Sequence, residues 1–221
     1  MSAAFAQIDH EPAPLIEAAA FVLSLRARGI ADLGLLRAME TVRREVFAPR
    51  RYGDLARQDV ALPLPCGETM TGPTSVAIML ASLGLAPGMR VLEIGTGSGY
   101  VTALLVALGA QVHSIERKPV LFDSARQRLR AAGFGAGCET ACGDGLIPDG
   151  SETRYDRVIL NGAVVDGMAP PAATSRLAVG GRLVAGAQGG AGDTRLLVVD
   201  RGEGGDLSTR LGPPIRLSRL S

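Results

Sequence analysis

The feature that most constrains this chain is a short apolar run that ends in glycines at alternate positions. Residues 91–94 read Val-Leu-Glu-Ile, and Gly95, Gly97 and Gly99 follow. The run predicts a buried parallel strand, and the glycines predict a sharp turn into a helix whose backbone lies close to a ligand. A dinucleotide fingerprint would need glycine at position 100, where Tyr100 stands, and no P-loop lysine follows. The pattern therefore disfavours a dinucleotide pyrophosphate as the ligand.

Alternating strand and helix patterns surround this turn. Strands are expected at residues 91–94, 111–115, 138–141, 155–160 and 181–185. Helices are expected at residues 15–28, 32–39, 74–85, 98–108, 119–133 and 171–177, the second of them capped by Asp32. Repeated strand-helix-strand units predict an α/β, Rossmann-like fold with a mostly parallel, doubly wound sheet, helices on both faces and right-handed crossovers. Ligands of such sheets bind at the carboxyl ends of the strands.

The 221 residues are expected to form one domain with three parts. Residues 1–60 form a helical N-terminal cover, residues 61–185 the core, and residues 186–221 glycine-rich strands and loops. Within the core, three prolines and two glycines at residues 61–73 predict an ordered loop without a regular element. Residues 186–205 are expected to form a flexible hairpin.

Composition narrows the classes of protein to consider. Hydrophobic residues make up 47% of the chain and charged residues 20%, which excludes a disordered chain, and the 29 glycines keep no period of three, which excludes collagen. The net charge of +1 offers nothing to a nucleic acid or an anionic membrane, and no apolar stretch is long enough to span a bilayer. Oligomeric state stays open.

Cysteine and histidine usage gives the remaining expectations. Three cysteines, an odd number, do not make a disulfide framework, so a reducing cytoplasm is expected. None of them has a neighbouring histidine, and no metal site is expected. The two histidines, His10 and His113, are interpreted as a tail residue and a strand residue rather than catalysts.

Three acids stand where predicted strands end. Glu93 closes the first strand, Glu116 follows the second, and Asp144, with Gly145 after it, follows the third. A carboxylate at the end of the second strand of a Rossmann-like unit can accept hydrogen bonds from both hydroxyls of a ribose. Residues after the third strand commonly face an adenine. Because three acids lie at strand ends, a tight turn that binds no ligand is a poor explanation of the glycine pattern.

The acid with glycines at every second position is the pattern of class I methyltransferases that use S-adenosylmethionine. More narrowly, residues of about 23–185 resemble the protein-L-isoaspartate O-methyltransferases. The matching residues, in family order and spacing, are 25–32, 36–39, 44–45, 47, 62–63, 67, 69, 73, 91–100, 114–117, 125–126, 143–145 and 180–181. This resemblance implies methylation of the α-carboxylate of L-isoaspartyl residues in damaged proteins, as a repair reaction.

The resemblance also implies roles for individual residues. Thr71 stands where the family has a serine near the transferred methyl group, and it is the implied catalytic residue. The implied substrate side is Glu68, Thr69 and Asn161. The implied cofactor-binding residues are Glu93, Gly95, Thr96, Gly97, Gly99, Glu116, Asp144 and Gly145. Isoaspartyl-containing peptides or proteins are the implied partners.

The substrate half departs from the family more than the cofactor half does. Glu68 replaces a glutamine and puts a negative charge near a site for a negatively charged acceptor. Residues 161–166 and the stretch from Gly186 to Gln188 also differ from the family pattern. Two alternatives therefore stay open: a methyltransferase with another carboxylate or a small molecule as acceptor, and a protein that binds S-adenosylmethionine without catalysis. A nucleic-acid methyltransferase would show a Pro-Pro-aromatic run after Asn161, and Gly-Ala-Val stands there instead.

Overall fold

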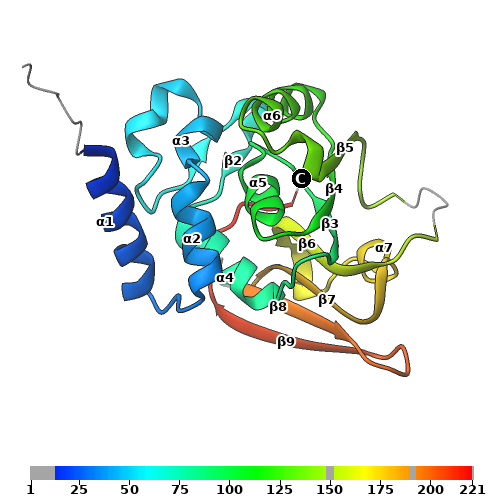
Figure 1. The fold of residues 1–221 in the computed structure, drawn as a ribbon. Helices are drawn as coiled ribbons and strands as arrows, with labels where there is room; N and C mark the ends of the chain where they lie inside the picture. Colours follow the sequence, from blue (N-terminus) through cyan, green and yellow to red (C-terminus); the bar gives the residue numbers. More distant parts are fainter. Residues whose placement is uncertain (1–12, 148–151, 190–192, 221) are drawn as a thin grey trace, which may run out of the picture.

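A mixed sheet of seven strands runs through the computed structural model, which describes residues 13–147, 152–189 and 193–220 (Figure 1). Its strands lie in the order β5-β4-β3-β6-β7-β8-β9. The first five of these are mutually parallel, and β8 and β9 add to the edge as antiparallel strands. The strands are β3 (Arg90–Ile94), β4 (Gln111–Glu116), β5 (Cys138–Cys142), β6 (Tyr155–Val164), β7 (Leu177–Gln188), β8 (Thr194–Arg201) and β9 (Leu207–Pro214).

All five predicted strands are present, and β6 and β7 are longer than expected. The hairpin expected at residues 186–205 is present, since β7 and β8 pair antiparallel over seven registered positions. The expectation that it is flexible is wrong for β8, and residues 190–192 lie outside the described part. The reason is visible in the Leu-Leu-Val-Val run of β8, because Leu196 and Val198 pack on one face of the sheet and Leu197 and Val199 on the other. A strand buried on both faces is a fixed part of the core.

The helices follow the predicted pattern with shifted ends. Asp32 caps the second helix by accepting a hydrogen bond from the Leu35 amide at 2.9 Å. The helix expected from residue 98 begins only at Tyr100, and the last one ends at Thr174 because β7 starts soon after. The helices are α1 (Ala13–Ala27), α2 (Leu33–Thr41), α3 (Arg44–Phe47), α4 (Pro73–Leu83), α5 (Tyr100–Ala107), α6 (Pro119–Ala131) and α7 (Pro171–Thr174), with 3-10 turns η1 (Arg50–Leu55), η2 (Pro65–Gly67), η3 (Gly135–Gly137) and η4 (Val165–Gly167).

The two faces of the sheet are covered unequally. Side chains of α1, α2, α4, α5 and α6 join one buried cluster with Val91, Ile159 and Val184 of the sheet. The opposite face, with Leu92 and Val158, packs against the four-residue α7 and the end of the chain. The expectation of helices on both faces therefore holds only in small part. The connection from β5 to β6 has no helix in its described residues, since glycine and proline interrupt it.

Two irregular segments, residues 61–73 and the chain after β9, meet near the carboxyl ends of the parallel strands. The expected loop at residues 61–73 contains a small regular element after all, since β1 (Leu62–Pro63) pairs antiparallel with β2 (Thr69–Met70). After β9 the chain, red in Figure 1, turns back toward the middle of the sheet. There Arg219 forms a parallel bridge with Ala163, at the end of β6.

The strand order fixes where a ligand can bind. From β3 the chain continues to β4 and β5 on one side, and then crosses to β6 on the other side. The crevice at the carboxyl ends of β3 and β6 is therefore the topological switch point, where sheets of this kind bind ligands. As for membranes, the helices in the described part of the chain are all too short or too polar to span one.

Candidate active site

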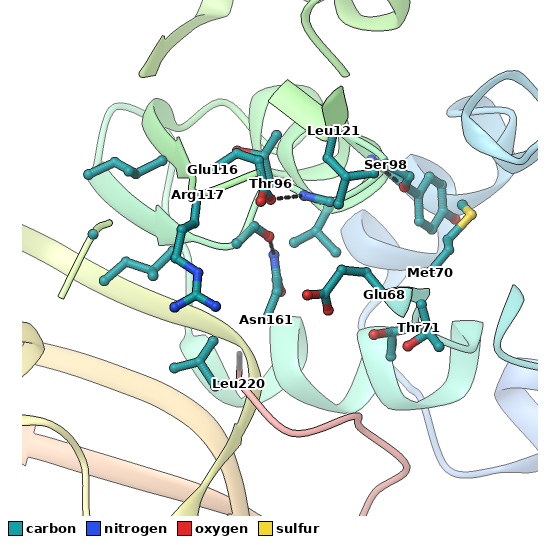
Figure 2. A pocket seen from close by; sticks show the side chains of 18 of the residues that line it. Glu68, Met70, Thr71, Thr96, Ser98, Glu116, Arg117, Leu121, Asn161 and Leu220 are labelled. Carbon is teal, nitrogen blue, oxygen red and sulfur yellow. Dashed lines mark hydrogen bonds between the residues drawn. The ribbon is translucent and has the colours of Figure 1, made fainter. Parts of the chain in front are cut away.

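A cavity opens at this switch point (Figure 2). Its walls come from six parts of the chain that are far apart in sequence. They are residues 68–71, the turn after β3 at 94–98, the end of β4 at 115–117, residues 143–146 after β5, Asn161 on β6, and residues 219–220. Val76, Tyr100, Val101 and Leu121 complete the lining. The cavity thus joins the predicted cofactor half to the predicted substrate half.

The glycine turn is shaped by backbone conformations that favour glycine. Gly95, Gly97 and Gly99 all have positive φ angles, of 91°, 57° and 88°. The turn is held by two backbone bonds, from Gly95 to the carbonyl of Ile115 at 2.8 Å and from Gly99 to that of Thr96 at 2.9 Å. Gly95 and Gly97 line the cavity, so their backbone is open to a ligand.

Glu116 ties the end of β4 to the glycine turn. One carboxylate oxygen accepts the Gly97 amide and the other accepts the Lys118 amide, both at 2.8 Å. The side chain is only 5% exposed, yet it lies on the cavity wall. Because each carboxylate oxygen can accept two hydrogen bonds, both oxygens keep capacity for a ligand.

Glu93 lies behind the wall. It is fully buried, and one of its oxygens accepts the hydroxyls of Thr102 at 2.5 Å and Ser114 at 2.7 Å. The other oxygen accepts the side-chain amide of Asn161 at 2.6 Å, and the same amide reaches the Gly95 carbonyl at 2.9 Å. Burial raises the pKa of Glu93 to about 7 despite these hydrogen bonds. Glu93 therefore fixes Asn161 and the start of the glycine turn.

Two predicted cofactor residues consequently do not reach the cavity wall. Glu93 is one, for the reason just given, and Gly99 is the other. A Cβ on Gly99 would lie 3.3 Å from Leu129 Cγ and 3.4 Å from Ala125 Cβ, so this glycine allows α6 to approach the turn. Both residues therefore shape the wall from behind, and direct contact of either with a ligand stays a prediction.

Asp144 and Gly145 form the part of the wall that follows β5. Asp144 Oδ1 accepts the Leu146 amide at 2.9 Å, which holds the turn. A Cβ on Gly145 would lie 3.0 Å from side-chain carbons of Ile94, so this glycine is needed for close packing against β3. The Gly143 amide donates to the Glu116 carbonyl at 2.9 Å, which links this turn to β4.

The predicted substrate residues face these groups across the cavity. Thr71 lines the wall, and its carbonyl oxygen accepts the guanidinium of Arg44 at 3.0 Å. The hydroxyls of Thr69 and Ser218 lie 2.6 Å apart. In Figure 2, the carboxyl group of Glu68 points into the cavity toward Asn161. The structure therefore brings Glu68, Thr69 and Thr71 to one wall, whereas Asn161 lies beside the glycine turn, where it bonds to the Gly95 carbonyl.

Several lining residues were missed from the sequence. Arg117 points into the cavity from the end of β4 (Figure 2), and its place directly after Glu116 could have indicated it. Arg219 and Leu220 come from the segment after β9, and no local pattern marks them. Arg44 is also missed, since it acts on Thr71 from outside the cavity.

The cysteines and His113 stand apart from this site. Cys66, Cys138 and Cys142 are free thiols. Within the described part of the chain, no three His, Cys, Asp or Glu side chains lie together in a way that could hold a metal ion. His113 lies on β4 as expected, with Nδ1 at 2.7 Å from the Tyr155 hydroxyl, and does not line the cavity. His10 lies outside the described residues.

Comparison with known proteins decides the family. Residues 17–213 match the family model of protein-L-isoaspartate(D-aspartate) O-methyltransferase. A protein-L-isoaspartate O-methyltransferase of Nitrobacter winogradskyi is 39% identical over 203 residues, which cover 92% of this chain and 91% of that protein. The chain belongs to this family. A second relative, protein-L-isoaspartate O-methyltransferase 2 of Rhodopseudomonas palustris, is 46% identical over 70% of each chain.

The fold agrees with this family. A Plasmodium falciparum protein described as a protein-L-isoaspartate O-methyltransferase, crystallised with S-adenosyl-L-homocysteine, superposes with a TM-score of 0.78. The match covers 91% of this chain and 97% of that one, at 17% identity. The class I methyltransferase fold and the family are thus confirmed as predicted. The predicted enzyme class, protein-L-isoaspartate O-methyltransferase, is confirmed with them.

Proposed function

We propose that this enzyme methylates the α-carboxylate of L-isoaspartyl residues in damaged peptides and proteins, with S-adenosylmethionine as the methyl donor. One observation carries the proposal. A single cavity joins the glycine turn and Glu116 on one wall to the Thr71 hydroxyl on the other. A donor and an acceptor bound to the two walls would therefore meet inside it.

The residues of the first wall fit the donor. A Cβ on Gly97 would meet nothing closer than Leu64 Cδ1 at 3.8 Å, so the glycine turn leaves room for a ligand against its backbone. Glu116 is fixed by two backbone amides and still has acceptor capacity, which suits the two hydroxyls of a ribose. We assign Gly95, Thr96 and Gly97 to the methionine side, Glu116 to the ribose, and Asp144 with Gly145 to the adenine side.

The reaction asks little acid-base chemistry of the protein. S-adenosylmethionine supplies a methyl group on a positively charged sulfur, and an ionised carboxylate can accept it without losing a proton. Aspartyl carboxylates are ionised at neutral pH, so no general base is needed. The work left to the protein is alignment of the two reactants and exclusion of water. An enzyme of this kind needs no histidine in its cavity.

Thr71 is the residue that we assign to the acceptor. Its hydroxyl makes no hydrogen bond with any residue in the described part of the chain, and its side chain lines the cavity. A hydroxyl in this position can donate to one oxygen of the acceptor carboxylate while the other oxygen attacks. Asn161 is held by Glu93 and the Gly95 carbonyl, so we assign it to positioning the wall between the two halves.

A labelled-methyl assay with paired peptides tests the proposal. We expect base-labile methyl ester on an isoaspartyl peptide and none on the aspartyl peptide of the same sequence. Incorporation into neither peptide, together with normal binding of S-adenosylhomocysteine, would overturn the isoaspartyl assignment. Release of S-adenosylhomocysteine with another acceptor would then favour the alternative of a changed acceptor, which Glu68 motivates.

Two further proposals concern the cellular compartment of the enzyme and its number of domains. The three free thiols suit a reducing compartment, and we propose the cytoplasm. We also propose a single methyltransferase domain, because β8 and β9 extend the same sheet as the core strands.

A further inference from the structure

The segment after β9 forms part of the acceptor wall. The Ala163 amide donates to the Ser218 carbonyl at 2.8 Å, and the Leu220 amide donates to the Ala163 carbonyl at 2.9 Å. The hydroxyl pair of Ser218 and Thr69 joins the same segment to β2. Arg219, between these anchors, lines the cavity. The backbone is therefore held at the residues on either side of Arg219, while Arg219 itself is exposed.

The residue before Ala163 is adapted to this segment. A Cβ on Gly162 would lie 2.7 Å from the Cα of Leu220, a distance that real Cβ atoms do not show. Gly162 therefore permits the segment to lie directly on β6. The departure from the family pattern at residues 161–166, which begins inside β6, thus coincides with a position where the C-terminal segment needs the space.

The charges on the acceptor side then need an explanation. Glu68 lines the cavity and bears a negative charge, which would repel a negatively charged acceptor. Arg219 lines the same cavity and makes no ion pair or hydrogen bond through its guanidinium with any described residue. An arginine guanidinium forms strong, charge-assisted hydrogen bonds with carboxylates.

We propose that Arg219 is a specificity-determining residue that binds the carboxylate of the isoaspartyl acceptor and offsets the repulsion from Glu68. The inference rests on the proposed function, and it assigns the substrate class of the site to acceptors that carry a negative charge. A guanidinium hydrogen bond to the same carboxylate oxygen that accepts the Thr71 hydroxyl leaves the second oxygen to attack the methyl group. We expect Arg219 to affect the binding of the acceptor and not the binding of the donor.

Calorimetry with an isoaspartyl peptide, added to enzyme saturated with S-adenosylhomocysteine, tests this proposal. The Arg219→Gln variant should bind the peptide about 10- to 100-fold more weakly, the loss expected for a hydrogen bond to a charged group. Its affinity for S-adenosylhomocysteine should equal that of the wild type, which also shows that the variant folds. The matched control is Arg216→Gln, on the same segment but outside the cavity, which should leave both affinities unchanged.

The charge offset is tested by a second substitution. Adding Glu68→Gln to Arg219→Gln should recover part of the lost peptide affinity, because the repulsion disappears with it. The inference would be overturned if Arg219→Gln bound the peptide as tightly as the wild type does, or if the double variant recovered no affinity. Either result would leave the proposed function intact. A wild-type enzyme that neither binds nor methylates the isoaspartyl peptide would overturn both.

Discussion

Arg44 holds the main chain of Thr71, through a hydrogen bond of 3.0 Å from Nη2 to the Thr71 carbonyl oxygen. The arginine is 2% exposed, and it also donates to the carbonyls of Ala56 at 2.5 Å and Val60 at 3.2 Å. Its guanidinium lies over the Tyr100 ring, 5.9 Å from the centroid, at the start of the helix that follows the glycine turn. A buried cation thus connects the loop that carries Thr71 to the helix that follows the glycine turn.

Replacing Arg44 with methionine should destabilise the enzyme and slow catalysis. Three carbonyl oxygens would lose their donor, at a cost of about 2–4 kcal/mol in the free energy of unfolding. Thr71 would lose its support, so kcat should fall by about tenfold or more while the affinity for S-adenosylhomocysteine changes little. Urea unfolding and steady-state kinetics measure the two effects. Arg43→Met, at the exposed neighbour, is the control, and equal losses in both variants would refute the role of Arg44.

Replacement of Thr71 separates its hydroxyl from its shape. Thr71→Val keeps the volume and removes the hydrogen-bond donor, so kcat on the isoaspartyl peptide should fall by about 10- to 100-fold. Thr71→Ser keeps the hydroxyl and should retain most of the activity. The measurement is kcat and KM for the peptide in both variants. Full activity of Thr71→Val would show that the hydroxyl does not take part.

Removal of the Glu116 carboxylate should weaken donor binding. Glu116→Ala loses the proposed ribose hydrogen bonds and also frees the amides of Gly97 and Lys118, so the affinity for S-adenosylhomocysteine should fall by about 1.5–3 kcal/mol. Calorimetry measures this directly. Glu139→Ala, at an exposed position on the neighbouring β5, serves as the control. Unchanged affinity in Glu116→Ala would mean that the ribose is held elsewhere.

Glu93 should make stability depend on pH in an unusual direction. Burial raises its pKa from 4.5 to about 7 in the folded enzyme, with a smaller contribution from the charge of Glu116. Between these values the folded state keeps a proton that the unfolded state has lost. The stabilisation is complete below pH 4.5 and is lost as the pH rises through 7, by an amount on the order of 3 kcal/mol.

The Glu93→Gln variant isolates this effect. Its amide oxygen can still accept the side chain of Asn161, and the hydroxyls of Thr102 and Ser114 can turn to accept its NH₂ group. Urea unfolding at pH 5 and pH 7.5 should show a smaller loss of stability with rising pH in the variant than in the wild type. Identical pH profiles would rule out Glu93 as the titrating group.

Gly162→Ala should damage the acceptor side alone. The new Cβ would meet Leu220 and displace the segment that carries Arg219. The affinity for the peptide should fall by about tenfold, because contacts from the displaced segment are lost. The affinity for S-adenosylhomocysteine should stay unchanged. Gly53→Ala is a matched control, since nothing lies within 4 Å of a Cβ there. Normal peptide binding in Gly162→Ala would contradict the placement of this segment.

The parts of the site that could be predicted from the sequence are those made by neighbouring residues. The glycine turn after β3 and Glu116 at the end of β4 each follow a strand that the apolar pattern identifies. Their meeting in one cavity follows from the rule that parallel strands end at the same edge.

The unpredicted parts depend on packing between distant segments. Whether Glu93 faces the ligand or the core depends on which donors surround it, and Thr102, Ser114 and Asn161 take up its oxygens. Arg219 lies in a segment without helical or alternating pattern, and only its pairing with β6 brings it to the cavity. The sparsely covered face of the sheet follows from the lack of a helix among the described residues between β5 and β6, which propensity alone does not locate.

The hydroxyl pair of Thr69 and Ser218 joins residues that are 149 positions apart, whereas Gly97 and Glu116 are 19 apart. Closing a chain loop costs entropy that grows with its length, and contacts between distant residues slow folding. The proposed donor wall can therefore form as soon as β3, α5, β4 and β5 have come together. The acceptor wall needs the whole sheet and the return of the chain to β6, so it depends on the cooperative folding of the entire domain.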